Sequence, residues 1–303
     1  MRDSSNENAC PPGNVVEERG CPRVRGRWSP AWRIGRALLI VYLSIVLVVM
    51  FLENSLIFFP SPYPDGVWHP AGLAFEDASF QSADGTPLHG WYVPKKNARA
   101  AVLFCHGNAG NITHRAHILQ MLHHRVNVST LIFDYRGYGR SEGKPNEAGV
   151  LADARAARRW LADREKIAEA DVVLMGESIG GAVAVDLAAR DGARALVLIS
   201  TFSSLPDVAA YHYPWLPVRW AMRTRLDSEN KIGNYHGPLL QSHGDADIIV
   251  PLQFGQRLFD AANQPKEFLL YPGYNHNDPM PSEYYDHLAA FLDGIQDLAP
   301  HGR

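Results

Sequence analysis

The chain has 303 residues, of which 46% are hydrophobic and 20% are charged, and its formal net charge at pH 7 is −3. This composition is too apolar and too weakly charged for a disordered chain, and it excludes collagen-like and low-complexity proteins. Because no cluster of Lys and Arg occurs in the main body, we expect no nucleic-acid partner. The three cysteines, Cys10, Cys21 and Cys105, are too few for a disulfide framework and wrongly spaced for a structural zinc site.

An apolar segment near the N-terminus is the strongest local feature of the sequence. Residues 37–52 carry no charged side chain, and as a helix they extend about 24 Å, a little short of the roughly 30 Å hydrocarbon core of a bilayer. Flanking arginines and aromatic residues suit the two headgroup regions. We therefore expect a transmembrane anchor over residues 37–59. The alternatives are a buried core helix and a cleaved signal peptide, which the long polar lead and the lack of an Ala-x-Ala site disfavour.

The charges on either side of this segment predict its orientation. Six arginines lie between Arg19 and Arg36, whereas no Lys or Arg occurs between Leu52 and Lys95. The positive-inside rule then places a basic tail, residues 1–36, in the cytoplasm. We expect a single-pass membrane protein whose catalytic domain is extracytoplasmic.

The chain after the anchor divides into a connector and one folded domain. Four prolines predict a stiff, extended connector over residues 60–70. Residues 71–303 are enough for one large α/β domain. An Asp-Gly pair at residues 84–85 predicts a hairpin between its first two strands.

Short apolar runs alternate with amphipathic stretches along this domain. The expected strands are residues 73–80, 87–93, 100–105, 129–134, 171–175, 195–200, 238–242 and 267–271. The expected helices are residues 114–124, 147–162, 179–189, 252–262 and 282–296. Because the later strands are continuous runs of Val, Leu and Ile, we expect an eight-stranded, mostly parallel sheet with helices on both faces. Catalytic groups then gather at the carboxyl ends of the strands.

Two segments of the chain match the pattern G-x-S-x-G. Residues 176–180 directly follow an apolar strand and open a helix, which is the setting of a nucleophile elbow. Residues 139–143 come several positions after their strand and run into a Lys-Pro pair, which is typical of a surface loop. We therefore expect Ser178 to be a nucleophile and Ser141 to be a turn residue; the alternative is that both are turn motifs.

A serine nucleophile needs a base, and the base needs an acid that fixes its tautomer. His276 follows the last strand in a Gly/Asn-rich loop and is the expected base. Asp245 and Asp247 both follow the strand before it, and spacing favours Asp247 only modestly. The histidines that we expect to be exposed or structural are His212, His243 and His287.

The tetrahedral intermediate of acyl transfer needs two N–H donors. One is expected from Ile179, immediately after the nucleophile. The other is expected from the loop at residues 106–111, HGNAGN, with Asn108 favoured and Ala109 as the alternative. This loop lacks the Gly-Lys-Ser/Thr of a phosphate-binding P-loop, so we do not expect nucleotide binding.

These motifs together resemble the α/β-hydrolase superfamily of serine hydrolases. The segments that carry the resemblance are HGNAGN, FDYRGYGRSEG, GESIGG, HGDADIIVP and GYNHND. They look like the branch with small lids, which includes single-span membrane-anchored hydrolases and proteins described as serine aminopeptidase-like or thioesterase-like. The resemblance covers residues 53–296, and the first 36 residues do not share it. Cys10 and Cys21 do not form the dense cysteine cluster of the palmitoylated, depalmitoylating members.

The resemblance implies an α/β-hydrolase fold with a short cap, and a role for each matching residue. The family's acid is the Asp of HG-x-x-D, which matches Asp247 and not Asp245. The other implied roles are nucleophile for Ser178, base for His276 and backbone oxyanion donor for Asn108 and Ile179.

The cap is expected at about residues 203–236, after the sixth strand. It carries four aromatic side chains that suit an acyl pocket or contact with the bilayer, with ordinary lid packing as the alternative. They are Tyr211, Tyr213, Trp215 and Trp220.

The expected function is that of a membrane-anchored serine hydrolase that cleaves a carboxylic ester or thioester through an acyl-Ser178 intermediate. Its expected partners are a small-molecule acyl substrate, lipid-like substrates included, and the bilayer through residues 37–59. No metal and no organic cofactor is expected. One alternative is an aminopeptidase or acyl-peptide hydrolase, for which Glu177 is the candidate to bind a substrate ammonium group. The other is a catalytically silent membrane scaffold.

Overall fold

The computed structural model describes residues 30–295. Residues 1–29, which make up most of the expected basic tail, and residues 296–303 lie outside the described part. The chain divides into two units, residues 1–44 and residues 45–303. The larger unit holds every strand and the whole of the expected catalytic domain that is described.

Helix α1 (Pro30–Phe51) is 22 residues long and has no buried side chain. At 1.5 Å per residue it extends about 33 Å, and it is long and apolar enough to cross a membrane by length and composition. It begins ahead of the expected residue 37 and ends ahead of the expected residue 59. The backbone leaves the helical region at Leu52, and a separate short helix, α2 (Glu53–Ile57), follows.

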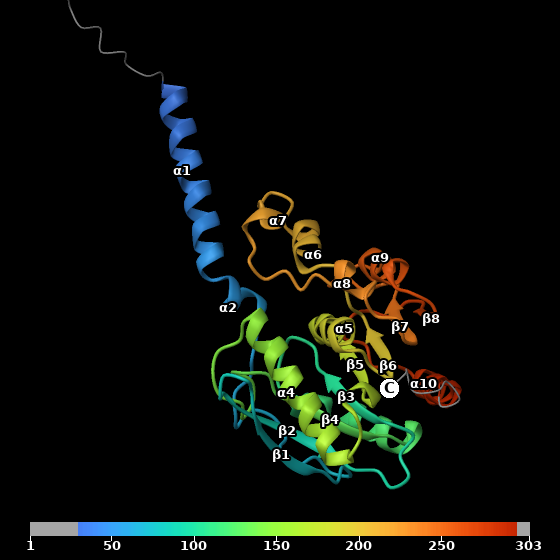
Figure 1. Ribbon diagram of the computed structural model, residues 1–303. Coiled ribbons are helices and arrows are strands. Elements are labelled where there is room, and N and C mark those ends of the chain that lie inside the picture. The colour runs from blue at the N-terminus through green and yellow to red at the C-terminus, as the bar shows by residue number, and fades with distance from the viewer. Residues whose placement is uncertain (1–29, 296–303) are drawn as a thin grey trace, which may run out of the picture. The chain divides into compact units, whose positions relative to one another are not determined.

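The eight strands form one sheet in the order β1-β2-β4-β3-β5-β6-β7-β8 (Figure 1). The strands are β1 (Glu76–Gln81), β2 (Pro87–Val93), β3 (Ala101–Cys105), β4 (Ser129–Phe133), β5 (Val173–Glu177), β6 (Ala195–Ile199), β7 (Leu239–Gly244) and β8 (Lys266–Tyr271). The β1–β2 and β2–β4 pairs are antiparallel, and the other five pairs are parallel. The predicted eight-stranded, mostly parallel sheet is therefore confirmed.

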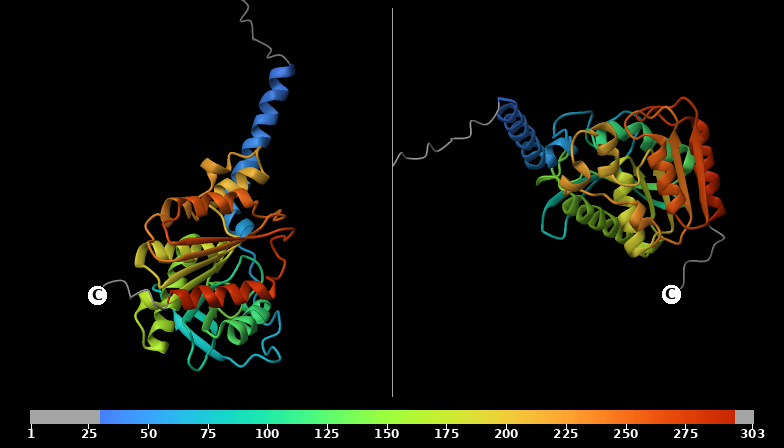
Figure 2. Two further views of the ribbon diagram at one scale, coloured as in Figure 1. Left: turned by 90° about the vertical axis from the view of Figure 1, so that its right-hand side faces the viewer. Right: turned by 90° about the horizontal axis from the view of Figure 1, so that it is seen from above.

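Helices cover both faces of this sheet (Figure 2). The longer segments of the domain are α4 (Glu147–Glu165), α5 (Ile179–Asp191), α6 (Leu205–His212), α9 (Leu252–Ala261) and α10 (Ser282–Gly294). The shorter ones are η1 (Ile112–Arg115), α3 (Ala116–Met121), η2 (Leu122–Val126), η3 (Glu169–Asp171), α7 (Val218–Ala221) and α8 (Glu229–Ile232). The cap that the sequence predicts contains α6, α7 and α8.

Alternate residues of the central strands point to opposite faces, which produces two hydrophobic cores. In β3, Leu103 and Cys105 pack in the core under α4, α5 and α9. Val102 and Phe104 pack in the second core, under α3 and α10. Each face of the strand is thus fully buried, which explains why β3 reads as a continuous apolar run in the sequence.

The connector between α2 and β1 belongs to the folded domain. Phe58 lies in the first core and Trp68 in the second, at 3% and 8% exposure. Isolated β-bridges join Pro60 to Gly110 and Pro62 to Gly139. The N–H groups of Ser61 and Tyr63, which alternate with the prolines, donate to the carbonyl groups of Gly110 and Gly139 in the neighbouring loops. The folded structure therefore begins well before residue 71.

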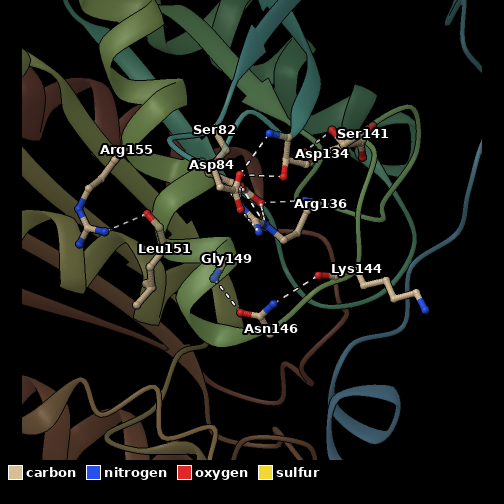
Figure 3. Close-up of polar contacts among 12 residues, drawn as sticks. Ser82, Asp84, Asp134, Arg136, Ser141, Lys144, Asn146, Gly149, Leu151 and Arg155 are labelled. Atoms are coloured by element: carbon tan, nitrogen blue, oxygen red, sulfur yellow. Dashed lines mark hydrogen bonds and ion pairs between the residues drawn. The ribbon is translucent and has the colours of Figure 1, made fainter.

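A buried arginine ties the β1–β2 hairpin to the sheet and to α4 (Figure 3). The side chain of Arg136, just after β4, donates to Asp153 of α4, with an Nη2–Oδ1 distance of 2.7 Å. Its Nη1 donates to Asp84 in the hairpin turn at 2.8 Å. Asp153 is fully buried, so this ion pair has little competition from water. A Cβ on Gly149 would lie 2.5 Å from the Arg136 side chain, which explains a glycine in the first turn of α4.

Removing one partner of this buried pair should destabilise the fold. We expect Asp153→Ala to lower the free energy of unfolding by about 3 kcal/mol, because Arg136 loses its buried carboxylate partner and keeps only Asp84, which is half exposed. The matched control is Asp163→Ala, on the exposed side of the same helix, where we expect a change within about 0.5 kcal/mol. Thermal unfolding of both variants measures the difference, and equal melting temperatures would contradict this account of the pair.

Candidate active site

Ser178 occupies a sharp turn between β5 and α5. Its backbone has φ +54° and ψ −120°, a conformation that non-glycine residues rarely adopt. A Cβ on Gly176 would lie 2.3 Å from the carbonyl oxygen of Gly180, and a Cβ on Gly180 would lie 2.0 Å from that of Cys105. Both positions therefore require glycine, and the turn has the geometry of a nucleophile elbow.

Three side chains from different strand ends form one series of hydrogen bonds. His276, in the loop after β8, has its Nε2 3.0 Å from the Oγ of Ser178. Its Nδ1 lies 2.7 Å from Oδ2 of Asp247, in the loop after β7. The side chains of His276 and Asp247 are 7% and 0% exposed. The structure thus brings together the serine, the histidine and the acid that the sequence analysis singles out.

The environment of Asp247 keeps its carboxyl group ionised. Burial by itself raises the pKa of this group, but hydrogen bonds from His243 and His276 and from the N–H of Val250 outweigh that effect and hold the pKa below its ordinary value. Oδ1 accepts the N–H groups of Ile249 and Val250 at 2.9 and 2.7 Å. An ionised acceptor at Oδ2 fixes the proton of His276 on Nδ1 and leaves Nε2 as the acceptor that faces Ser178.

The alternative candidates for the acid and the nucleophile, Asp245 and Ser141, have hydrogen-bond partners outside the site. Asp245 accepts the N–H of Gly273 at 2.6 Å and makes no contact with His276. The Oγ of Ser141 accepts the N–H of His89 at 3.0 Å and donates to the carbonyl of Asp134 at 2.6 Å, the second of which appears in Figure 3. Ser141 is buried in a loop and has no histidine side chain as a hydrogen-bond partner. Its role in this loop is therefore structural.

The other histidines are also accounted for. His243 is buried within β7, where its Nε2 donates to the carbonyl of Val250 at 2.8 Å and lies 3.4 Å from Asp247. His212 bonds the carbonyl of Ile249 at 2.9 Å, and His287 pairs with Glu267 at 2.8 Å. His243 thus contributes to the site indirectly, by supporting the acid.

Asn275 joins the loop that carries the acid to the loop that carries the histidine. Its Oδ1 accepts the N–H of Ile248 at 3.1 Å and the N–H of His276 at 2.8 Å. Its own N–H donates to Asp278 at 2.7 Å. No motif in the sequence singles out Asn275, although its place beside His276 in a Gly/Asn-rich loop is a usable signal.

Two N–H groups next to the elbow have no acceptor within the described chain. One is the N–H of Asn108, in the loop after β3, and the other is the N–H of Ile179, the first residue of α5. The elbow packs directly against the start of that loop, since Gly180 contacts Cys105 and His106. Burial lowers the pKa of His106 to about 3, so its ring stays neutral and its Nδ1 donates to the carbonyl of Gly107 at 2.7 Å.

A cavity of about 380 Å³ opens beside His276, and Glu177, next to the nucleophile, lines it. The carboxylate of Glu177 pairs with Arg115, with an Oε2–Nε distance of 3.4 Å, and both side chains are less than one-fifth exposed. Glu177 therefore already has a guanidinium group beside its carboxylate, although its Oε2 makes no hydrogen bond within residues 30–295.

The four aromatic residues of the cap lie on its surface. Tyr211, Tyr213, Trp215 and Trp220 have exposed fractions of 56%, 53%, 57% and 95%. Tyr211 also packs edge-on against Phe254, with ring centroids 5.9 Å apart. Within residues 30–295, no group of three or more His, Cys, Asp or Glu side chains is arranged to hold a metal ion.

Comparison with known proteins places the chain in a family. The α/β hydrolase domain-containing protein WAV2 of Arabidopsis thaliana is 30% identical over 251 residues, which are 76% of this chain and 82% of that protein. The uncharacterised protein Rv2307c of Mycobacterium tuberculosis is 43% identical over 237 residues, with coverage of 77% and 84%. Together with the fold, these matches show that the chain belongs to the α/β-hydrolase superfamily.

A match to a family model and a match to a solved structure agree with this assignment to the α/β-hydrolase superfamily. The serine aminopeptidase, S33, family matches residues 96–226, which include the elbow and the loop at Asn108. Among solved structures, the esterase Pf2001 of Pyrococcus furiosus has a similar fold, with a TM-score of 0.64 and 20% identity over 78% of this chain and 98% of that one. The protein is therefore a hydrolase of the α/β class.

Proposed function

We propose that this protein is a membrane-anchored serine hydrolase that cleaves a carboxylic ester or thioester through an acyl-Ser178 intermediate. The observation that carries the proposal is the series of hydrogen bonds from Asp247 through His276 to the Ser178 hydroxyl. Each member is supplied by the carboxyl end of a parallel strand, where α/β folds place their reacting groups.

In the first half of the reaction, Ser178 Oγ attacks the substrate carbonyl while Nε2 of His276 takes its proton. Asp247 stabilises the imidazolium ion that results. The negative oxygen of the tetrahedral intermediate accepts hydrogen bonds from the free N–H groups of Asn108 and Ile179. The bond to the leaving group then breaks, and His276 gives its proton to the departing alcohol or thiol.

In the second half, water cleaves the acyl-enzyme. His276 takes a proton from the water as its oxygen attacks the acyl carbon, and a second tetrahedral intermediate forms at the same two N–H donors. When this intermediate collapses, the proton returns to Ser178 Oγ and the carboxylic acid leaves. No metal or organic cofactor enters either half.

The pairing of Glu177 with Arg115 favours an ester or thioester substrate over a peptide with a free N-terminal ammonium group. An aminopeptidase needs an acidic group whose charge is available to the substrate ammonium ion, and Glu177 already has a guanidinium partner. Binding an ammonium ion there would require breaking that ion pair. The name of the matching family nevertheless makes peptide substrates the second candidate, to be tested directly.

We further propose that α1 anchors the enzyme in a bilayer, with the N-terminus in the cytoplasm and the catalytic domain outside it. The exposed Trp and Tyr side chains of the cap suit the interface between water and lipid, where such residues are enriched. An enzyme tethered in this way has direct access to lipid-like acyl substrates.

The nucleophile can be tested by covalent labelling. We expect a fluorophosphonate probe to label the wild-type protein and to leave Ser178→Ala unlabelled, because only an activated serine attacks phosphorus at a useful rate. Ser141→Ala is the matched control: it removes the serine of the second G-x-S-x-G segment, and labelling should persist. Unlabelled wild-type protein, or equal labelling of Ser178→Ala, would overturn the proposed function.

The substrate class can be tested with p-nitrophenyl esters of varied acyl length and with aminoacyl anilides. We expect Ser178-dependent hydrolysis of the esters and no anilide hydrolysis above the Ser178→Ala background. Anilide cleavage that depends on Ser178, and that Glu177→Gln weakens by raising KM, would instead identify an aminopeptidase.

The orientation can be tested in sealed vesicles whose cytoplasmic face is outward. We expect added protease to remove an epitope tag placed at the N-terminus and to leave the catalytic domain intact until detergent opens the vesicles. Digestion of the domain with protection of the tag would reverse the proposed topology.

A further inference from the structure

The segment between the apolar helix and the sheet lies against the loop that supplies one oxyanion donor. We call residues 53–65 the juxtamembrane segment and residues 106–111 the oxyanion loop. The segment begins with α2, visible in Figure 1 immediately after α1, and continues as extended chain. The two stretches are about 50 residues apart in sequence, yet they are joined by a set of hydrogen bonds.

The side chain of Asn108 uses both of its polar atoms in this contact. Its Nδ2 donates to the carbonyl oxygen of Ile57 at 2.5 Å. Its Oδ1 accepts the N–H of Phe59 at 3.2 Å and the hydroxyl of Tyr138 at 3.0 Å. The amide group of Asn108 is thus held between the segment and a buried tyrosine, and its orientation is fixed by three hydrogen bonds.

The backbone of the two stretches also pairs. The N–H of Gly110 donates to the carbonyl of Phe59 at 3.2 Å, and the N–H of Ser61 donates to the carbonyl of Gly110 at 3.0 Å. Nδ2 of the fully buried Asn111 donates to the carbonyls of Ser61 and Asp65 at 3.1 and 2.9 Å. These contacts extend from Asn108 to Asn111, along the second half of the oxyanion loop.

The beginning of the segment is fixed to the cap. Glu53 is only 7% exposed, and its carboxylate accepts the N–H groups of Arg223 and Thr224 at 2.9 and 2.6 Å. Phe58 is buried in the first core. The segment is therefore held at Glu53, at Phe58 and along the oxyanion loop, and it can serve as a rigid support.

The two oxyanion donors differ in what positions them. The N–H of Ile179 is fixed by the elbow itself, as the first residue of α5. Asn108 lies in a loop between two glycines, Gly107 and Gly110, the second with φ +84°, so the loop has little conformational preference of its own. An external partner must hold it, and the juxtamembrane segment makes two of the three hydrogen bonds of the Asn108 side chain.

We propose that the juxtamembrane segment is a positioning element of the active site, which acts through the side chain of Asn108 to aim its backbone N–H at the reacting carbonyl. This proposal rests on the proposed function, because it gives a task to one of that reaction's donors. The anchor of the enzyme is thereby continuous with its catalytic machinery. Ile57 and Phe59 act through their backbone groups, and neither touches the substrate.

The test uses two variants of the full-length protein in detergent micelles. Asn108→Ala removes the three side-chain hydrogen bonds and keeps the N–H donor. Phe59→Pro removes the N–H that Oδ1 accepts and alters no group of the oxyanion loop. For each we expect kcat on a p-nitrophenyl ester to fall about 10- to 100-fold with little change in KM, because a misplaced donor weakens binding of the transition state and not of the substrate.

A second readout separates positioning from general loss of stability. A trifluoromethyl ketone forms a tetrahedral adduct with Ser178 and places its oxygen at the oxyanion donors, so its affinity should fall in parallel with kcat. The midpoint of the pH dependence of kcat/KM should stay unchanged. Asn263→Ala is the matched control: its amide donates to the carbonyls of Gly233 and Tyr235, far from the site, and kcat should be unchanged.

The outcomes are distinct. Wild-type kcat and ketone affinity in both Asn108→Ala and Phe59→Pro would overturn the inference and leave the proposed function standing. A loss in Phe59→Pro no greater than that in Phe59→Ala, which keeps the N–H, would also overturn it. Failure of the wild-type protein to react with fluorophosphonate at Ser178 would instead defeat the proposed function.

Discussion

The tight turn at Ser178 is the constraint on which the rest of the structure depends. A serine with φ +54° costs about 1–3 kcal/mol unless its surroundings hold it in place. Here β5 lies between β3 and β6 near the middle of the sheet, and Gly180 is pressed against the carbonyl of Cys105. The same turn directs the hydroxyl toward His276, and within residues 30–295 it leaves the N–H of Ile179, at the start of α5, without a hydrogen-bond acceptor. Two functional groups thus follow from one strained conformation, and a well-packed central sheet is what maintains it.

The remaining groups of the site are brought to the turn by loops, and buried hydrogen bonds fix those loops. Asp247 is charged although buried, because its oxygens accept two backbone N–H groups and face two histidines. Asn275 joins its loop to that of His276. The base therefore has a defined tautomer and a defined distance to the serine before any substrate arrives, which is the preorganisation that acyl transfer requires.

The sequence was informative wherever a function leaves a local pattern. The strands, their alternation with helices along the chain and the preference for Ser178 over Ser141 follow from apolar runs and from the positions of the glycines. Spacing favours Asp247 over Asp245 only modestly, and resemblance to a family settles the choice, because the two residues lie two positions apart and the deciding contact is with His276, 29 residues away. The contacts of Glu53 with Thr224 and of Asn108 with Ile57 span 171 and 51 residues. No periodicity in the chain records such pairs, which is why the connector was expected to stand apart from the domain.

The burial of Phe58 and Trp68 has a practical consequence for anyone who wishes to produce the enzyme without its anchor. A chain that starts at residue 71 would lack one aromatic side chain from each of the two cores and every hydrogen bond between the connector and the loop at Asn108. The cut has to lie ahead of Glu53, whose carboxylate accepts hydrogen bonds from the cap, and residues 45–52 also belong to the larger unit. The boundary between the two units falls at residues 44–45, inside the apolar helix, so an exchange of the anchor for another carrier should leave the last residues of that helix attached to the catalytic domain.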